Sequence, residues 1–326
     1  MIPAFKVTVE GEDITSTLSP RLIALTLQDQ AGSESDAVTI TIDDTDNRVT
    51  LPEHGALLKV SLGYSGGLRE FGDYTVDEVE VSGPPDTLRF TGRAADLRGN
   101  LKEPRSRSWH NITLAGLVQA IAAEHNMEPR VSERFTAETL THIDQLNESD
   151  LNLLVRLAEQ YDAVCKPVGN RLLFLERAQG KTVSGQQLPT ITLFKPDLTS
   201  WSTTLPDRAV YQSVVACYTD VAGGNLVEVQ AGRGKPAYRI KTAFPDEEQA
   251  TKAAVGKLAR LSRTERTLKI DLPGRPDLIA ETPVVMEGFR SGVAGKWIVE
   301  SATHTISKRG YTTAVELVPD LREVTT

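Results

Sequence analysis

The chain of 326 residues has little that could serve redox chemistry or cross a membrane. Its cysteines, Cys165 and Cys217, lie far apart on predicted strands, so we read both as small buried hydrophobes in a reducing cytoplasm rather than as a disulfide framework. No apolar run approaches the length of a membrane span, and the start, MIPAFKVTVEGED, lacks a basic region followed by an apolar core. From these absences we expect the chain to have no secretion signal and no membrane anchor.

Positive charge is also in deficit, since the formal net charge is -8. Backbone recognition of nucleic acid needs concentrated Lys and Arg, so this balance argues against stable nucleic-acid binding. A short basic run of Lys102, Arg105 and Arg107 is interrupted by Glu103. We expect it to be a solvated linker or a partner-facing loop.

Patterns that would indicate a catalytic or ligand site are incomplete. The five histidines show neither HxxxH nor HExxH spacing. Ser65, within GYSGG, precedes a strand pattern, whereas a nucleophile elbow needs a helix there. The acids at 43–47 lack the glycine and closing glutamate of a calcium loop, and residues 232–235 lack the GxxxxGK spacing of a phosphate loop. The sequence therefore predicts no catalytic residue, no cofactor and no metal ligand.

Alternating apolar and polar residues dominate the first hundred positions, as in FKVTVE, AVTITID, VDEVEV and TLRFTG. Turn clusters at residues 32–33, 63–67 and 83–85 separate these segments at hairpin-like intervals. An antiparallel barrel or sandwich is expected here. The chain is β-rich again after residue 186, interrupted by a helix at about 246–263 with an acidic start and a basic end.

Helical periodicity marks the middle of the chain, at residues 113–125 and 148–161. We expect Thr113 or Asn111 to cap the first helix. Asn147 is the expected cap of the second, with Glu148 and Asp150 supplying negative charge and Asp150 in the place of a capping-box acid. Such a structural use suffices to explain these two carboxylates without catalysis. Two strands joined at Gly169-Asn170 follow, at 163–168 and 171–176.

The tryptophans, Trp109, Trp201 and Trp297, stand near the starts of predicted elements, where a large ring commonly closes a core. Core packing is the default interpretation. Trp109 follows the basic run and is the best interface candidate of the three. Trp109, Arg105 and Arg107 therefore form the predicted interface.

Three segments carry a family resemblance. QLNESDLNLLVRLAEQYDA at 145–163 is similar to the phrase QxNESDxxFLxRLAExxG, with Asp162-Ala163 replacing the common glycine. PRSRSWHNITLAGLVQAIAAEHN at 104–126 is similar to an RSxSW segment leading into a helix, and the third segment runs from Leu62 to Leu97. Together they resemble the late control protein D family of contractile-tailed phages, whose members are tail or baseplate hub proteins, and the hub-like part of VgrG spike proteins of type VI secretion.

The resemblance implies a mainly β, α+β fold with two tail-tube-like antiparallel β-barrel domains, at 1–100 and 186–326, around a central helix-containing domain at 101–185. It implies a non-enzymatic hub, a homotrimeric ring that adapts a sixfold tail tube to a threefold spike. The implied partners are the tail tube, tail spike, baseplate wedge and tape measure proteins. The implied location is the tail baseplate of a virion or bacteriocin particle, assembled in the bacterial cytoplasm.

Two alternatives stay open at this point. A cell-wall-binding or peptidoglycan-degrading tail protein would need an additional module. The hub layout, however, already accounts for all 326 residues. The hub portion of a type VI-like spike would continue into a long β-helix, whereas this chain ends at LREVTT, so a separate spike is expected. The sequence does not distinguish a phage, a prophage and a headless tail bacteriocin.

Overall fold

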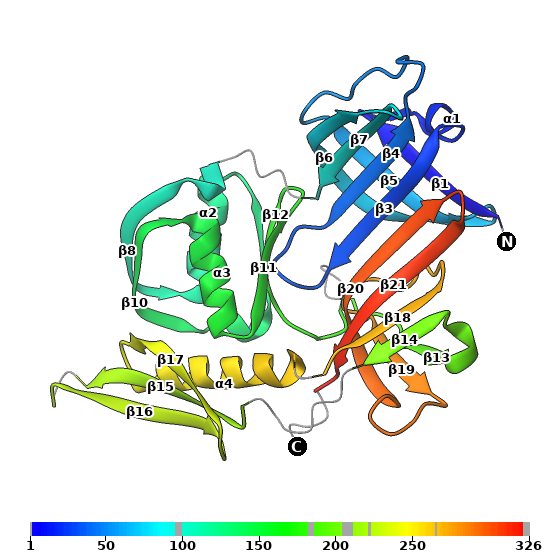
Figure 1. The fold of residues 1–326 in the computed structure, drawn as a ribbon. Helices are drawn as coiled ribbons and strands as arrows, with labels where there is room; N and C mark the ends of the chain where they lie inside the picture. Colours follow the sequence, from blue (N-terminus) through cyan, green and yellow to red (C-terminus); the bar gives the residue numbers. More distant parts are fainter. Residues whose placement is uncertain are drawn as a thin grey trace.

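The computed structural model describes residues 2–94, 100–181, 186–203, 211–220, 223–264 and 266–321. Strands far outnumber helices within these ranges, which confirms the expected mainly β, α+β fold (Figure 1). No α-helix in the same ranges is both long and apolar enough to span a membrane.

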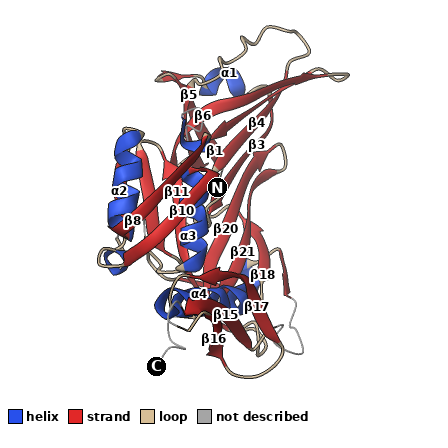
Figure 2. Ribbon diagram, turned by 90° about the vertical axis from the view of Figure 1, so that its left-hand side faces the viewer, coloured by secondary structure: helices blue, strands red, loops and turns tan. Residues whose placement is uncertain are grey.

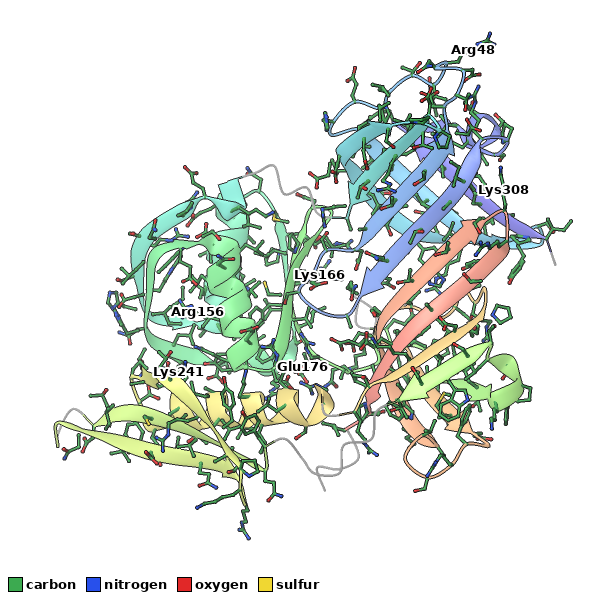
Figure 3. All side chains as sticks on the ribbon, viewed as in Figure 1. Arg48, Arg156, Lys166, Glu176, Lys241 and Lys308 are labelled. Carbon is green, nitrogen blue, oxygen red and sulfur yellow. The ribbon has the colours of Figure 1, made fainter. Side chains whose placement is uncertain are left out.

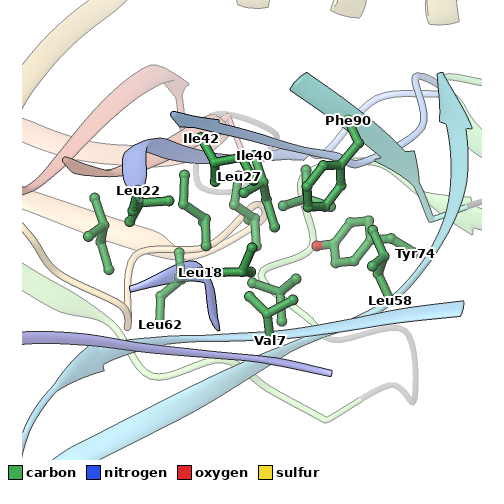
Figure 4. Packing of buried hydrophobic residues seen from close by; sticks show 14 of the residues in the cluster. Val7, Leu18, Leu22, Leu27, Ile40, Ile42, Leu58, Leu62, Tyr74 and Phe90 are labelled. Atoms are coloured by element: carbon green, nitrogen blue, oxygen red, sulfur yellow. The ribbon is translucent and has the colours of Figure 1, made fainter. Parts of the chain in front are cut away.

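The N-terminal region is a curled antiparallel sheet with the strand order β3-β4-β7-β6-β5-β1-β2. Inward-facing side chains such as Ile40 and Ile42 are fully buried, while Thr39 and Thr41 point outward, as the period-two alternation predicted. The core fills the space between β3 and β4 on one side and β1 and β5 on the other (Figure 4). The elements are β1 (Pro3–Val9), β2 (Glu12–Asp13), α1 (Thr15–Leu18), β3 (Leu22–Gln30), β4 (Ala37–Asp43), β5 (Leu57–Tyr64), β6 (Gly67–Ser82) and β7 (Thr87–Arg93).

Strand β20 (Gly295–Ser307) joins this region to the C-terminal strands by pairing with β3, from Ser301 opposite Gln30 to Ser307 opposite Ala24. One 13-stranded sheet results. A bulge between Val299 and Ser301 separates the part of β20 that pairs with β19 from the part that pairs with β3. The remaining elements are β13 (Ile191–Phe194), η3 (Lys195–Asp197), β14 (Ser200–Thr203), β18 (Leu268–Pro273), β19 (Pro283–Glu287) and β21 (Gly310–Pro319).

Two of the tryptophans belong to the core of these C-terminal strands. Trp297 on β20 is buried, and its Nε1 donates to the Val293 carbonyl over 2.8 Å. Trp201 on β14 packs edge-on against Phe289, with ring centroids 5.6 Å apart. The default interpretation is confirmed for both rings.

The central region packs two helices between two small sheets (Figure 1). It lies beside the long sheet (Figure 2). On one side lies the ribbon of β8 and β10, and on the other lies the three-stranded sheet β11-β12-β9. Its elements are η1 (Asn100–Lys102), β8 (Pro104–Thr113), α2 (Leu114–Glu124), β9 (Glu128–Val131), η2 (Glu133–Phe135), β10 (Thr139–Ser149), α3 (Asp150–Gln160), β11 (Ala163–Val168) and β12 (Arg171–Glu176). Both predicted helices and the predicted hairpin are therefore confirmed.

The cap of α3 differs from the prediction. Ser149 is the N-cap, and its Oγ accepts a hydrogen bond from the Asn152 N–H over 3.2 Å. Asn147 lies in an irregular stretch of β10 at φ 46°, so the strand runs on to Ser149 before the helix begins. Asp150 is consequently the first helical residue and cannot be the capping-box acid. The cap of α2 is Thr113, as expected.

Residues 213–264 form a further layer with its own core. Strands β15 (Ser213–Asp220), β16 (Asn225–Gly232) and β17 (Ala237–Phe244) pack on α4 (Glu247–Thr264), which confirms the helix predicted near 246–263. The region after residue 186 thus holds two separate cores. The domain boundaries near residues 100 and 185 stay predictions.

The two cysteines have different environments. Cys165 is fully buried, and this burial raises the pKa of its thiol to about 12, as suits an inert core residue. Cys217 is half-exposed, so the expectation that it is buried is wrong. It alternates with Val214 and Ala216, which face α4, and therefore lies on the opposite side of β15, within 3.8 Å of the Arg239 guanidinium.

Candidate functional site around Asp150

The two best-defined motifs of the sequence meet where α3 begins. β8 and β10 pair antiparallel, which places Arg107 opposite Gln145 and Ser108 opposite Asp144. The basic run was expected to be a linker or loop, but Arg105 and Arg107 belong to strand β8, and this expectation is wrong. Alternation along β8 turns both arginines and Trp109 inward, toward the helices, and turns Ser106, Ser108 and His110 outward.

The carboxylate of Asp150 is completely buried and fully hydrogen-bonded. Its Oδ1 accepts from Arg107 Nη2 and from Gln145 Nε2, each over 2.7 Å. Its Oδ2 lies 2.8 Å from His125 Nε2 and 3.5 Å from Arg105 Nη1. We refer to this group of polar and charged residues as the Asp150 cluster. It comprises Asp150, Glu124, His125, Gln145, Arg105 and Arg107.

Glu124, at the end of α2, completes the charge balance of this cluster. It accepts from Arg105 Nη1 over 2.6 Å and from Arg107 Nη1 over 2.7 Å. Burial alone would raise the pKa of Asp150, but hydrogen bonds from His125 and Gln145 and the charge of Arg107 outweigh it and hold this pKa below its usual value. Two guanidinium groups thus face two carboxylates, which ties α2, α3 and β8 together.

Glu124, His125 and Asp150 also have the composition of a metal site, since one ligand atom from each falls within 4.8 Å of the others. Both carboxylates already bind guanidinium groups, however, and a metal ion would have to displace Arg105 and Arg107. The geometry therefore favours a structural ion-pair cluster over metal coordination.

The predicted interface residues are brought together on the inner face of β8. The Arg107 guanidinium lies over the Trp109 ring, 4.4 Å from its centroid, and Trp109 Nε1 donates to Gln145 Oε1 over 3.4 Å. Trp109 packs half-buried against the central core. The structure thus gives all three residues internal partners, and their role as an interface stays a prediction.

Sequence reasoning missed Gln145, Glu124 and the role of His125. The one available signal is the position of His125 as the last residue of the helix predicted at 113–125. What brings these groups to Asp150 is the register of β8 against β10, which the period of each strand does not encode. Ser65 lies in the turn between β5 and β6, so its interpretation as part of a hairpin rather than a nucleophile elbow is confirmed.

A second cluster of charges was not foreseen at all. It lines a cavity of about 890 Å³ between the end of β3, the sheet β11-β12-β9 and residues 279–281. Lys166 Nζ donates to the Gln30 carbonyl over 2.7 Å and to both oxygens of Asp36. Figure 3 shows Lys166 between the central region and the first sheet. Glu281, also in this cavity, accepts from the backbone N–H groups of Ala178 and Gly180.

Comparison with known proteins gives a consistent result. Residues 38–310 match the family model described as phage tail baseplate hub (GPD). The probable baseplate hub protein of Escherichia phage 186 is 33% identical, over 99% of this chain and 95% of the relative. The tail protein from Neisseria meningitidis MC58 has a similar fold, with a TM-score of 0.73, 14% identity and 98% of each chain covered.

A type VI secretion system component from E. coli shares the fold more distantly, with a TM-score of 0.56, 13% identity, and 97% of this chain and 76% of that chain covered. The resemblance drawn from the motifs at residues 104–126 and 145–163 is confirmed. The chain belongs to the phage tail baseplate hub (GPD) family.

Proposed function

We propose that the chain is a structural hub at the baseplate of a contractile tail, where three copies form a ring between a sixfold tail tube and a threefold spike. The observation that carries the proposal is the pairing of β3 with β20, which joins two β-rich bodies of one chain in a single sheet. With two such bodies in each of three chains, the ring has six β-rich bodies. This number matches the six positions of a sixfold tube. A ring of identical chains also satisfies closed cyclic symmetry.

The partners in this role are the tail tube protein and the tape measure protein, the spike, and the baseplate wedge proteins. The net charge of -8 is consistent with a ring through which DNA passes without adhering, because a phosphate backbone is repelled by an acidic wall. Family membership supports the baseplate as the location.

The role is non-enzymatic on this proposal. The carboxylates of the Asp150 cluster are neutralised by arginines, whereas a hydrolytic pair needs two carboxyl groups with separated pKa values in a cleft. Incubating the chain with purified peptidoglycan tests the cell-wall alternative. We expect neither co-sedimentation nor a fall in turbidity, and either result in excess of a bovine albumin control would favour the alternative.

The ring itself is tested by light scattering of the full chain across a concentration series, followed by addition of the cognate spike and tube proteins. We expect trimers with an open centre in negative-stain images, and a complex of three hub, six tube and three spike chains. A compact monomer at every concentration that the spike does not assemble would overturn the proposed ring.

A further inference from the structure

The outer face of the β8–β10 ribbon carries a pair of histidines that the hub role does not use. His110 and His142 stand directly opposite each other in the antiparallel register. Their Nδ1 atoms lie 3.0 Å apart, and their ring centroids are 4.6 Å apart. His110 is exposed, and 43% of the His142 side chain is accessible. An ion in solution can therefore reach both rings.

Asp144 determines which nitrogen of His142 is available. Its Oδ1 lies 3.1 Å from His142 Nε2 and accepts from Ser108 Oγ over 2.6 Å. A carboxylate oxygen accepts hydrogen bonds and has no proton to donate. Nε2 must then carry the proton, and the Nδ1 lone pair points toward His110. A carboxylate on the far nitrogen is the usual outer partner of a metal-binding histidine.

The separation of the two nitrogens fits a common metal ion. Two metal–nitrogen bonds of about 2.0–2.1 Å whose nitrogens are 3.0 Å apart enclose an angle of about 95°. This angle is close to the roughly 90° of octahedral or square-planar coordination. The observed separation of the nitrogens therefore suits an ion that both rings coordinate once each has turned its Nδ1 lone pair toward it.

We propose that His110 and His142 form a binding site for a divalent transition metal ion, coordinated through Nδ1 of each ring, with Asp144 positioning His142. The proton on the Nδ1 of His110 moves to its Nε2 when the ion binds, so the ring stays neutral. Water fills the remaining coordination positions, which face away from the ribbon. Because imidazole is the ligand, Cu²⁺ and Ni²⁺ bind more tightly than Zn²⁺, and Mg²⁺ and Ca²⁺ do not bind.

This site differs from the Asp150 cluster on the other face of the ribbon. There, two guanidinium groups already occupy the carboxylates. At the histidine pair, the Asp144 carboxylate contacts His142 and accepts from the Ser108 hydroxyl, and these groups orient His142 without supplying a competing positive charge.

Calorimetric titration of the full chain with Ni²⁺ at pH 7.5 measures the site. We expect one ion for each chain. Asp144→Asn should weaken binding by roughly 10-fold to 100-fold, and His110→Asn and His142→Asn by at least as much. His54→Asn is the matched control, because His54 is also exposed but contacts only the Asp77 carbonyl among the interactions described. It should bind Ni²⁺ like the unaltered chain.

A spectroscopic measurement separates coordination from a structural effect of the substitutions. Electron paramagnetic resonance of the Cu²⁺-loaded chain should show two nitrogen ligands, with two retained in Asp144→Asn and one in His142→Asn. No Ni²⁺ binding by the unaltered chain, unchanged binding in the double variant H110N/H142N, or fewer than two nitrogens on Cu²⁺ would each overturn the proposal.

Discussion

Lys166 on β11 donates to both oxygens of the Asp36 carboxylate, over 3.0 and 3.2 Å, and so joins the central region to the first sheet. The two side chains are only 10% and 17% exposed. Asp29 lies on the wall of the same cavity, and its Oδ2 accepts from the Ala280 N–H over 2.9 Å. Lys166 thus forms an ion pair with Asp36, whereas Asp29 has no comparable ion pair among the contacts described.

Replacing Asp29 by Asn should stabilise the chain at neutral pH. Burial, followed by the charge of Asp36, raises the pKa of Asp29 from 3.8 to about 6. Ionisation therefore disfavours the folded state above pH 6, and the penalty vanishes below about pH 4. After discounting for partial exposure, D29N should raise the free energy of unfolding by about 1 to 3 kcal/mol at pH 7.5 and change little at pH 4. Urea denaturation at both values measures this.

Asp36→Asn is the matched control for D29N. It leaves the ammonium group of Lys166 buried without its carboxylate, which should lower the free energy of unfolding by about 3 kcal/mol. A loss of stability at pH 7.5 in D29N as well would contradict the assignment of Asp29 as the disfavoured charge.

His304 should make the fold sensitive to acid. Its Nε2 donates to the Leu278 carbonyl over 3.1 Å, so Nδ1 is an acceptor with one lone pair, 3.0 Å from the Tyr311 hydroxyl and 3.1 Å from the Thr313 hydroxyl. Burial lowers the pKa of His304 from 6.5 to about 4. The unfolded chain therefore binds a proton more readily. The contribution of neutral His304 to the free energy of unfolding is complete above pH 6.5. It is lost as the pH falls toward 4, and the total loss is about 3 kcal/mol.

The variant that tests this is His304→Gln, which keeps a donor and an acceptor but does not titrate. It should flatten the decline in unfolding free energy between pH 6.5 and pH 4. The measurement is best made in the D29N background, because Asp29 contributes with the opposite sign over the same range. Identical slopes with and without His304 would refute the assignment.

Glu148 and Asp150, on either side of the N-cap of α3, should differ sharply in how much stability is lost when each is neutralised. Asp150→Asn removes a buried carboxylate that binds Arg107 and Arg105, so we expect a loss of about 3 to 5 kcal/mol in unfolding free energy. Glu148→Gln removes a partner of Arg156, whose side chain is 41% exposed, and should change stability by less than about 1 kcal/mol. Equal effects in urea denaturation would show that the Asp150 cluster is not the stronger constraint.

Local chemistry explains which parts of the fold the sequence could predict. Caps, periodicity and turn residues are encoded within a few positions, and they located α2, α3, α4 and the β11–β12 hairpin. The pairing of Lys166 with Asp36 spans 130 residues, and that of β3 with β20 spans most of the chain. No period encodes such partners, so neither the charged cavity nor the single long sheet could be foreseen.

The candidate site illustrates the same limit at closer range. Arg105 and Arg107 look like a solvated run in the sequence, because their partners Glu124 and Asp150 come from two different helices. Asn147 is a good capping residue, yet the irregular register of β10 gives this role to Ser149. In both cases tertiary pairing overrides a reasonable local preference.

Gly256 should be the residue that lets α4 approach α3. A Cβ atom at this position would lie 2.5 Å from the Gln160 carbonyl oxygen and 3.3 Å from the Asp162 nitrogen. In an unconstrained helix, Gly→Ala stabilises by about 1 kcal/mol. Here the added methyl group must push the helices apart, so we expect a net loss of about 1 to 3 kcal/mol.

Hydrogen exchange of the α4 amides measures this locally, because the layer of residues 213–264 has its own core and can open as a unit. Gly256→Ala should speed exchange across α4. Val255→Ala is the matched control, since residue Val255 is 52% exposed and truncating its side chain should leave exchange nearly unchanged. Slower exchange in G256A would mean that helix propensity outweighs the contact with Gln160, and that α4 does not rest on the end of α3.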